Sequence, residues 1–236
     1  MPALFTIYKR RVMIELNMDW GWGSHLPILK YFTREYDIDI IMEHGSGVHS
    51  TPILVSGCKQ YYGFEENEGF YNQMIAENVY TKDQVSLFRL PEKIDIATIQ
   101  KDVDIDDYFQ MDSDILSLAK KFAIEKNIFK DKELKLLFVD GFTCSRNLWI
   151  KHFKEYFDII IIHDTEPNSY NHYEYSFKDG VYTKAFNIYT VTSPTPYTSI
   201  LIRKGIGMNF DRLRLYLDEY CESQSWDYDE IDIIRE

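Results

Sequence analysis

Residues 40–51 have the sequence Ile-Ile-Met-Glu-His-Gly-Ser-Gly-Val-His-Ser-Thr, and this stretch decides the expected fold. An apolar run ends at Glu43, and the chain then turns through Gly45 and Gly47. A second run of apolar and aromatic residues ends at Glu65, 20 residues after Gly45. This order of elements is typical of half of a nucleoside-cofactor site: a strand, a glycine turn, a helix and a second strand that ends in a carboxylate. The glycines let the backbone approach the ligand, and the carboxylate accepts hydrogen bonds from ribose hydroxyls.

The residues around the turn indicate which cofactor binds. The dinucleotide fingerprint Gly-x-Gly-x-x-Gly is incomplete, because Ser50 stands at the last glycine position. Glu43 would repel a pyrophosphate, which favours amide donors and positive potential, whereas the ammonium of a methionine group favours an acid. The stretch resembles motif I of class I S-adenosylmethionine (SAM)-dependent methyltransferases, in the form Glu-x-Gly-Ser-Gly-x-x-Ser-Thr. The alternative is an ordinary strand–turn–helix junction without a ligand.

Length and composition fit one α/β domain. The chain has 236 residues, of which 45% are hydrophobic and 16% aromatic, enough for a packed core. No apolar run approaches the roughly 20 residues that span a membrane, and no signal peptide is evident at residues 1–11. Three widely spaced cysteines give no zinc or disulfide signature and suit a reducing compartment. The net charge of −12 argues against nucleic acid as the partner, although the acidic run at 102–114 also suits a solvated loop.

Apolar strands alternate with helices along the chain. Strands are predicted at 37–42, 60–65, 85–90, 134–140, 158–163, 186–192 and 198–203. Helices are predicted at 26–35 with Ser24 as a cap, from residue 49 or 50, and at 68–78, 113–126, 146–156 and 210–222. The short link before 198–203 allows antiparallel pairing, whereas a parallel return would need a crossover of about a dozen residues. We therefore predict an α/β fold: a Rossmann-like, seven-stranded, mostly parallel sheet with a C-terminal antiparallel β-hairpin and helices on both faces.

We predict a single domain over residues 1–236. Residues 1–36 form an N-terminal helical and loop cover, residues 37–204 form the core with an insertion at 91–133, and residues 205–236 form a C-terminal helical extension.

Acidic strand ends form the candidate chemical centre. Asp140 and Asp164 end adjacent predicted strands, so their carboxylates can converge. Two carboxylates can hold Mg²⁺ or Mn²⁺, which would orient an acceptor hydroxyl, and Glu166 is the candidate third ligand. Without a metal, Asp140 or His163 can act as the general base, although His163 can equally be fixed by backbone hydrogen bonds.

Two aromatic and polar clusters are candidates for an acceptor pocket. Trp20 and Trp22 precede the first predicted helix, and Tyr170 and His172 follow the strand at 158–163. Aromatic faces pack against sugar C–H surfaces, so these residues suit a carbohydrate. They can equally pin loops to the core. Arg146 can either contact the acceptor or cap a helix.

The whole motif set over residues 37–166, with the terminal hairpin, resembles a class I SAM-dependent methyltransferase. It is further similar to sugar O-methyltransferase domains of glycan-building proteins of large algal DNA viruses. The resemblance implies SAM as cofactor, with catalytic roles for Asp140, His163 and Asp164. The implied cofactor contacts are Glu43, His44, Gly45, Ser46, Gly47, Ser50, Thr51, Glu65 and Asp140.

This resemblance implies an O-methyltransferase that acts on a sugar or glycan acceptor in the cytoplasm, within a larger glycosyltransferase polypeptide. Two other classes stay open: an NAD-type oxidoreductase, and a catalytically silent Rossmann-like binding module. An RNA methyltransferase would need a partner subunit that supplies a basic surface.

Overall fold

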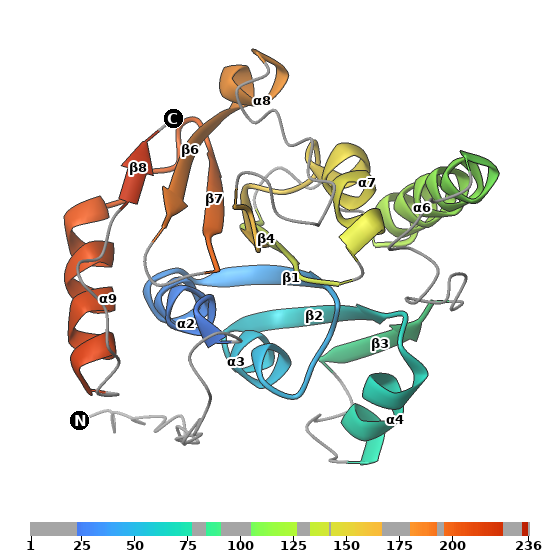
Figure 1. The fold of residues 1–236 in the computed structure, drawn as a ribbon, viewed down its shortest axis with the longest axis horizontal. Helices are drawn as coiled ribbons and strands as arrows, with labels where there is room; N and C mark the ends of the chain where they lie inside the picture. Colours follow the sequence, from blue (N-terminus) through green and yellow to red (C-terminus); the bar gives the residue numbers. More distant parts are fainter. Residues whose placement is uncertain are drawn as a thin grey trace, which may run out of the picture.

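The computed structural model describes residues 23–76, 84–90, 105–126, 133–141, 143–166, 180–192, 196–223 and 233–235. Their strands form one sheet in the order β3-β2-β1-β4-β5-β7-β6-β8 (Figure 1). The strands are β1 (Ile38–His44), β2 (Cys58–Glu65), β3 (Val85–Arg89), β4 (Lys135–Val139), β5 (Ile159–His163), β6 (Phe186–Val191), β7 (Thr198–Arg203) and β8 (Ile233–Arg235).

Strands β3, β2, β1, β4 and β5 are mutually parallel, whereas β7 lies antiparallel between β5 and β6. This arrangement confirms the predicted seven-stranded, mostly parallel sheet with its antiparallel hairpin. Strand β8 was not predicted, and it adds an eighth, three-residue strand antiparallel to β6.

Helices cover both faces of the sheet, as predicted. Helices α2 (Leu26–Glu35), α3 (Ser50–Ser56) and α9 (Phe210–Ser223) pack on one face. Helices α6 (Ile105–Glu125) and α7 (Thr143–Phe153) pack on the other. The remaining helices of the described chain are α4 (Glu68–Ala76) and α8 (Gly180–Ala185).

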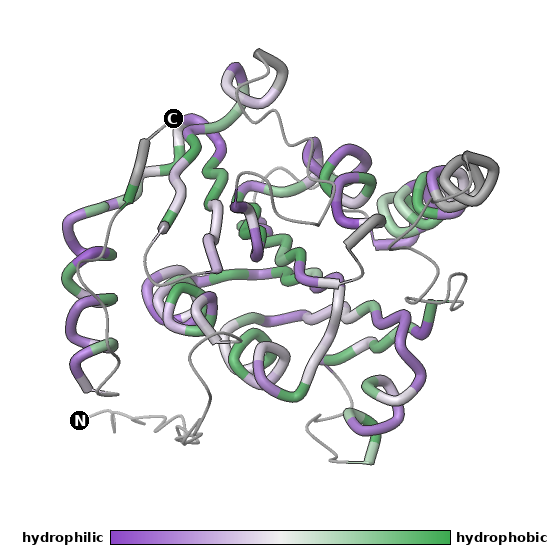
Figure 2. Tube along the Cα trace, in the orientation of Figure 1, coloured by the Kyte–Doolittle hydropathy of each residue, from purple (hydrophilic) through white to green (hydrophobic). Residues whose placement is uncertain are grey.

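Strands β4 and β5 are apolar except for Lys135 at the start of β4 and His163 at the end of β5, because both faces are covered. In β5, Ile159 and Ile161 belong to the core on the α2 side, whereas Ile160 and Ile162 belong to the core on the α7 side. This two-sided burial produces the continuous green of the central strands in Figure 2, while the helices alternate between apolar and polar residues.

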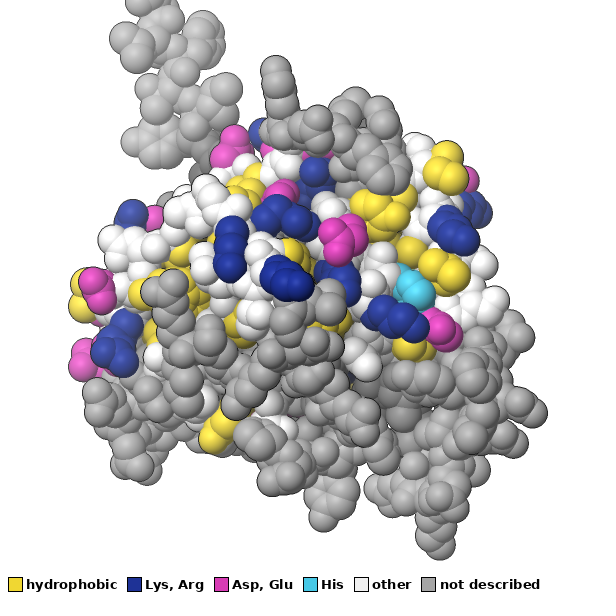
Figure 3. All heavy atoms as spheres, turned by 90° about the horizontal axis from the view of Figure 1, so that it is seen from above, with side chains coloured by type: hydrophobic (Ala, Val, Ile, Leu, Met, Phe, Trp, Pro, Cys, Tyr) yellow, Lys and Arg dark blue, Asp and Glu magenta, His cyan; other side chains and the backbone are white. Residues whose placement is uncertain are grey.

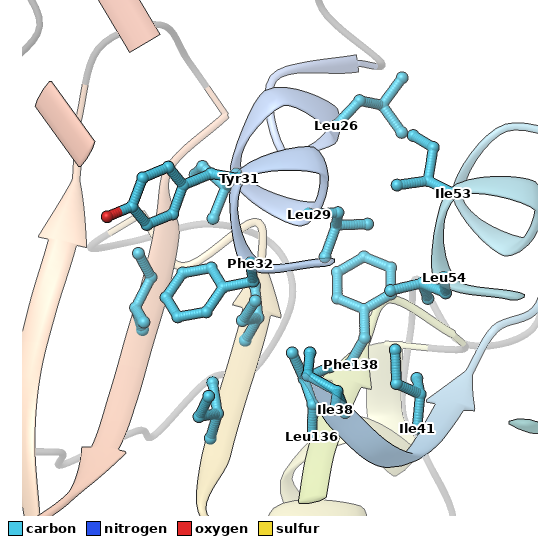
Figure 4. Packing of buried hydrophobic residues seen from close by; sticks show 14 of the residues in the cluster. Leu26, Leu29, Tyr31, Phe32, Ile38, Ile41, Ile53, Leu54, Leu136 and Phe138 are labelled. Carbon is cyan, nitrogen blue, oxygen red and sulfur yellow. The ribbon is translucent and has the colours of Figure 1, made fainter. Parts of the chain in front are cut away.

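Helix α2 covers part of one face of the sheet. Leu26, Leu29 and Phe32 pack among side chains of β1, β4 and α3 (Figure 4). Pro27 is accommodated in the first turn of α2, where its missing N–H costs nothing. The N-cap residue is His25, which makes no capping hydrogen bond with its side chain, so the predicted cap at Ser24 is wrong.

The division into a cover, a core with an insertion and a C-terminal extension stays a prediction. Within the described residues, no helix is long and apolar enough to cross a membrane. Cys58 and Cys221 are free thiols.

Candidate functional site

The two glycines of the turn after β1 have different surroundings. Gly45 has a φ of +86°, and a Cβ there would lie 2.3 Å from the backbone of Gly141 in the loop after β4. A side chain at Gly45 is therefore excluded both by conformation and by space. A Cβ at Gly47 would meet only the Ser50 hydroxyl, at 3.9 Å. Gly45 thus lets two strand-end loops touch, and Gly47 leaves the space beside the turn open.

Glu43, at the end of β1, is fully buried and held by hydroxyl groups. Its carboxylate accepts hydrogen bonds from Ser50 Oγ at 2.5 Å, from Thr51 Oγ1 at 2.6 Å and from the Tyr61 hydroxyl. The Tyr61 hydroxyl also lies 3.0 Å from Ser46 Oγ. Four of the expected cofactor contacts therefore belong to one internal network, which fixes the turn and the start of α3.

Burial sets the protonation of Glu43. It raises the pKa of the carboxyl from 4.5 to about 7, and the three hydroxyl hydrogen bonds, which favour the ionised form, offset only part of this rise. The nearby charge of Asp140 raises the pKa further.

Glu65 ends β2, next to the glycine turn, and its environment differs from that of Glu43. Its Oε1 accepts a hydrogen bond from the backbone N–H of Asn67 at 2.6 Å. Burial raises the pKa of Glu65 to about 8 against the effect of that N–H, and the charge of Glu66 adds to the rise. In contrast to Glu43, this carboxylate has no side-chain hydroxyl donor in the described residues. A ribose diol would supply such donors.

His44 points away from the network of Glu43 and ties together three segments. Its ring stacks on Trp149, with centroids 4.5 Å apart. Its Nε2 lies 3.1 Å from Glu66 Oε1 and 3.0 Å from Ser145 Oγ. A Cβ at Gly141 would lie 2.6 Å from this ring, so only glycine fits there. His44 is therefore buried under the loops rather than displayed toward a ligand.

Asp140 and Asp164 converge as predicted, because β4 and β5 are neighbours, and Arg146 lies between them. Arg146 donates from Nη1 to Asp164 Oδ2 at 3.0 Å, and its Nη2 lies 3.1 Å from Asp140 Oδ1. It also donates to the carbonyl oxygens of Gly141 at 2.5 Å, His163 at 3.0 Å and Asp140 at 3.2 Å. These five contacts account for all five N–H groups of a guanidinium. Arg146 was a candidate contact for the methyl acceptor, but the hydrogen-bonding capacity of its guanidinium is satisfied within the protein.

His163 is held between Asp140 and Ser24. Its Nδ1 lies 3.0 Å from Asp140 Oδ1, and its Nε2 lies 3.1 Å from Ser24 Oγ. The single hydroxyl proton of Ser24 goes to the carbonyl oxygen of Pro196 at 2.9 Å. His163 must therefore donate from both nitrogens, which makes it an imidazolium.

The electrostatics agree with this assignment. Burial lowers the pKa of His163, but the charge and hydrogen bond of Asp140 outweigh it and the pKa is raised. Burial likewise opposes ionisation of Asp140, but His163 and Arg146 hold its pKa well below the ordinary value. Neither group is a free general base at neutral pH. Ser24, His163 and Asp140 have the connectivity of a catalytic triad, but the buried serine donates away from the imidazole and is not activated.

The expected metal site does not fit these contacts. Glu166 Oε1 accepts the backbone N–H of Tyr197 at 2.8 Å instead of joining Asp140 and Asp164. A second group, His25, Asp140 and His163, has ligand atoms within 4.8 Å of one another. His25 is neutral there, since burial and then His163 lower its pKa to about 3. His163, however, has no lone pair to offer while both of its nitrogens donate.

The expected acceptor contacts Trp20, Trp22, Tyr170 and His172 lie outside the described residues. Sequence reasoning missed Ser24, His25, Tyr61, Glu66 and Ser145. For Tyr61 a signal was present, because a buried acid such as Glu43 requires donors and a buried tyrosine requires a partner for its hydroxyl.

The strand order, the antiparallel β7 and the glycine turn opposite Glu65 together decide the fold. The chain has a Rossmann-like α/β fold with a mostly parallel sheet and an antiparallel hairpin. No family model and no curated protein sequence matches it.

Solved structures of methyltransferases are similar at low identity. A protein from Streptococcus pneumoniae named as a tRNA (m1A22) methyltransferase, solved with SAM, has 12% identity and a TM-score of 0.42, covering 85% of this chain and 86% of its own. An rRNA methylase from Streptococcus thermophilus has 12% identity and a TM-score of 0.40, covering 75% and 94%. Magnesium protoporphyrin IX methyltransferase from Synechocystis PCC 6803, also with SAM, has 15% identity and a TM-score of 0.41, covering 78% and 77%.

These structures correct the expected partner. Two of the three are named for RNA modification, which contradicts a sugar or glycan acceptor and the absence of nucleic acid. On the face seen in Figure 3, several Lys and Arg side chains of the described residues lie near one another, with Asp and Glu side chains among them, although the net charge of the chain is −12. The comparisons give no support to a viral source, a glycan pathway or a metal ion.

Proposed function

We propose that this chain is a SAM-dependent methyltransferase whose cofactor lies along the carboxyl ends of β1, β2 and β4. The observation that carries the proposal is that an open glycine turn lies next to a buried carboxylate that accepts few hydrogen bonds. Gly47 has open space where a Cβ would stand, and the donors to Glu65 within the described residues are all backbone N–H groups. A nucleoside with two ribose hydroxyls fits both features.

The chain's own residues would divide the work of binding. Glu65 would accept hydrogen bonds from the ribose hydroxyls, and the backbone of the turn at Gly47 would approach the ligand. Glu43 holds the turn in shape through Ser50 and Thr51 and does not meet the ligand directly. The cofactor supplies an electrophilic methyl group on sulfur, and the protein must align an acceptor in line with that bond.

The state of the strand-end charges limits the acceptor chemistry. Asp140 is ionised with a depressed pKa and His163 is already protonated, so neither takes a proton from a hydroxyl. A nitrogen with a free lone pair needs no such base. The predicted O-methyl transfer stays a prediction, and it would require a base other than these two residues. RNA and porphyrin, named for the similar structures, are the first acceptors to screen.

The test is calorimetric titration of the purified chain with S-adenosylhomocysteine, with NAD titrated in parallel. Glu65→Ala should abolish binding of S-adenosylhomocysteine. Glu68→Ala is the matched control, because Glu68 lies three residues away and is exposed, paired only with Arg89. Binding of NAD in place of S-adenosylhomocysteine would support an oxidoreductase and refute the proposal. Binding of neither would favour a silent module.

A further inference from the structure

Asp140 and Asp164 come from neighbouring strand ends, and both carboxylates pair with Arg146. Two carboxylates from neighbouring strand ends are the usual start of a Mg²⁺ or Mn²⁺ site. Here Arg146 Nη1 lies 3.0 Å from Asp164 Oδ2 and Arg146 Nη2 lies 3.1 Å from Asp140 Oδ1. The guanidinium therefore bridges the two carboxylates and supplies the positive charge that a metal ion would otherwise bring.

The charges at the strand ends are already balanced. Arg146 and His163 supply two positive charges, and Asp140 and Asp164 supply two negative charges. The Arg146 and His163 side chains are each 6% exposed, whereas those of Asp140 and Asp164 are 21% and 23% exposed, so this pairing is partly shielded from water. A further divalent ion would have to enter a neutral, partly buried set, where an uncompensated charge is costly.

Arg146 also holds the backbone at the ends of β4 and β5 in place. It binds carbonyl oxygens in the loop after β4 and at the end of β5. Asp164 has a φ of +58°, a conformation that few residues other than glycine adopt, and its carboxylate is nevertheless held on Arg146. One side chain therefore fixes the ends of two strands.

We infer that Arg146 is a built-in replacement for a divalent ion. It positions Asp140 and Asp164, the strand ends bind no divalent metal in the wild-type chain, and removal of Arg146 uncovers a site for an oxygen-preferring cation. This inference does not depend on the proposed cofactor. Titrations with manganese and with S-adenosylhomocysteine can therefore succeed or fail independently.

The experiment compares binding of manganese to wild-type protein, Arg146→Ala and Arg203→Ala by electron paramagnetic resonance. Arg203 is the matched control, because it donates to three carbonyl oxygens and pairs with one carboxylate, that of Asp158. Both variants lose an arginine clamp, but only Arg146→Ala leaves two facing carboxylates.

We expect wild-type protein and Arg203→Ala to bind no manganese up to about 1 mM, where weak protein sites bind. Arg146→Ala should bind one equivalent, and saturating manganese should raise its Tm by about 5–10 °C. Adding Asp164→Asn to Arg146→Ala should remove both effects.

Two results would overturn the inference. One is a folded Arg146→Ala protein that binds no manganese. The other is one equivalent bound to wild-type protein and lost on Asp164→Asn or His25→Ala, which would show a working metal site beside Arg146. If Arg146→Ala does not fold, Arg146→Gln takes its place, and the wild-type titration decides between the two readings in either case.

Discussion

Glu43→Gln should make the stability of the chain less dependent on pH. In the folded chain the pKa of Glu43 is about 7 against an ordinary 4.5, so the carboxyl is protonated in a range where the unfolded chain is ionised. Each pKa unit corresponds to about 1.4 kcal/mol, so ionised buried Glu43 costs about 3 kcal/mol at pH 8 but less than about 1 kcal/mol at pH 5. Stability therefore falls as pH rises from 4.5 through 7.

The glutamine cannot ionise, so this loss should be absent in Glu43→Gln. The hydroxyls of Ser50, Thr51 and Tyr61 can each donate or accept, so they can still satisfy the amide. Between pH 5 and pH 8 the free energy of unfolding of wild-type protein should drop by about 2–3 kcal/mol relative to the variant.

Urea unfolding followed by circular dichroism at pH 5, 6.5 and 8 measures this difference. Glu68→Gln is the control, since Glu68 is exposed and should leave the pH dependence unchanged. Parallel curves for wild-type protein and Glu43→Gln would refute the reasoning, because they would mean that Glu43 has the same pKa in the folded and the unfolded chain.

Four further outcomes follow from the site. Gly45→Ala should lower the free energy of unfolding by more than about 2 kcal/mol, because of its positive φ and the 2.3 Å approach to backbone. Gly47→Ala should change the free energy of unfolding by less than about 0.5 kcal/mol, as measured by urea unfolding. The same substitution should weaken binding of S-adenosylhomocysteine at least about tenfold, as measured by calorimetry. His163 should titrate above 6.5 by NMR, and Ser24→Ala should lower that midpoint by removing the acceptor for Nε2–H; an unchanged midpoint would contradict the imidazolium assignment. Once transfer is established, its rate should be the same in a chelator, and a loss would contradict the role given to Arg146.

The sequence predicted most of the fold because the sheet is buried on both faces. Runs such as Ile159–Ile162 can only be central strands, and the short link before β7 left no room for a parallel return. Strand β8 could not be predicted this way. It is three residues long, and its pairing with β6 depends on where α9 delivers the chain. Helix α6 begins at Ile105, eight residues before the predicted start, within a run of acids that resembled a loop.

The candidate site was predictable to the level of strand ends and no further. Spacing placed Glu65 beside the glycine turn, and strand adjacency brought Asp140 and Asp164 together. The identity of the cation between them was not predictable, because Arg146 follows Asp140 by six residues and its reach depends on how α7 starts. Two facing acids imply a positive charge in general, but they do not specify whether a metal ion or a guanidinium supplies it.

Glu43 and Glu65, the two buried glutamates at the ends of β1 and β2, illustrate why residue type alone did not tell a structural role from a ligand-binding role. Both follow apolar strands, and burial raises the pKa of both. Glu43 has three hydroxyl donors from its own chain, so a ligand has nothing to add there. Glu65 has only backbone donors in the part of the chain that the structure describes, so a ligand that brings hydroxyls offsets part of the cost of its burial. The free energy of ligand binding should therefore depend on Glu65, while the free energy of folding depends on Glu43. Measuring both ligand binding and unfolding for a substitution at each position therefore tests both assignments.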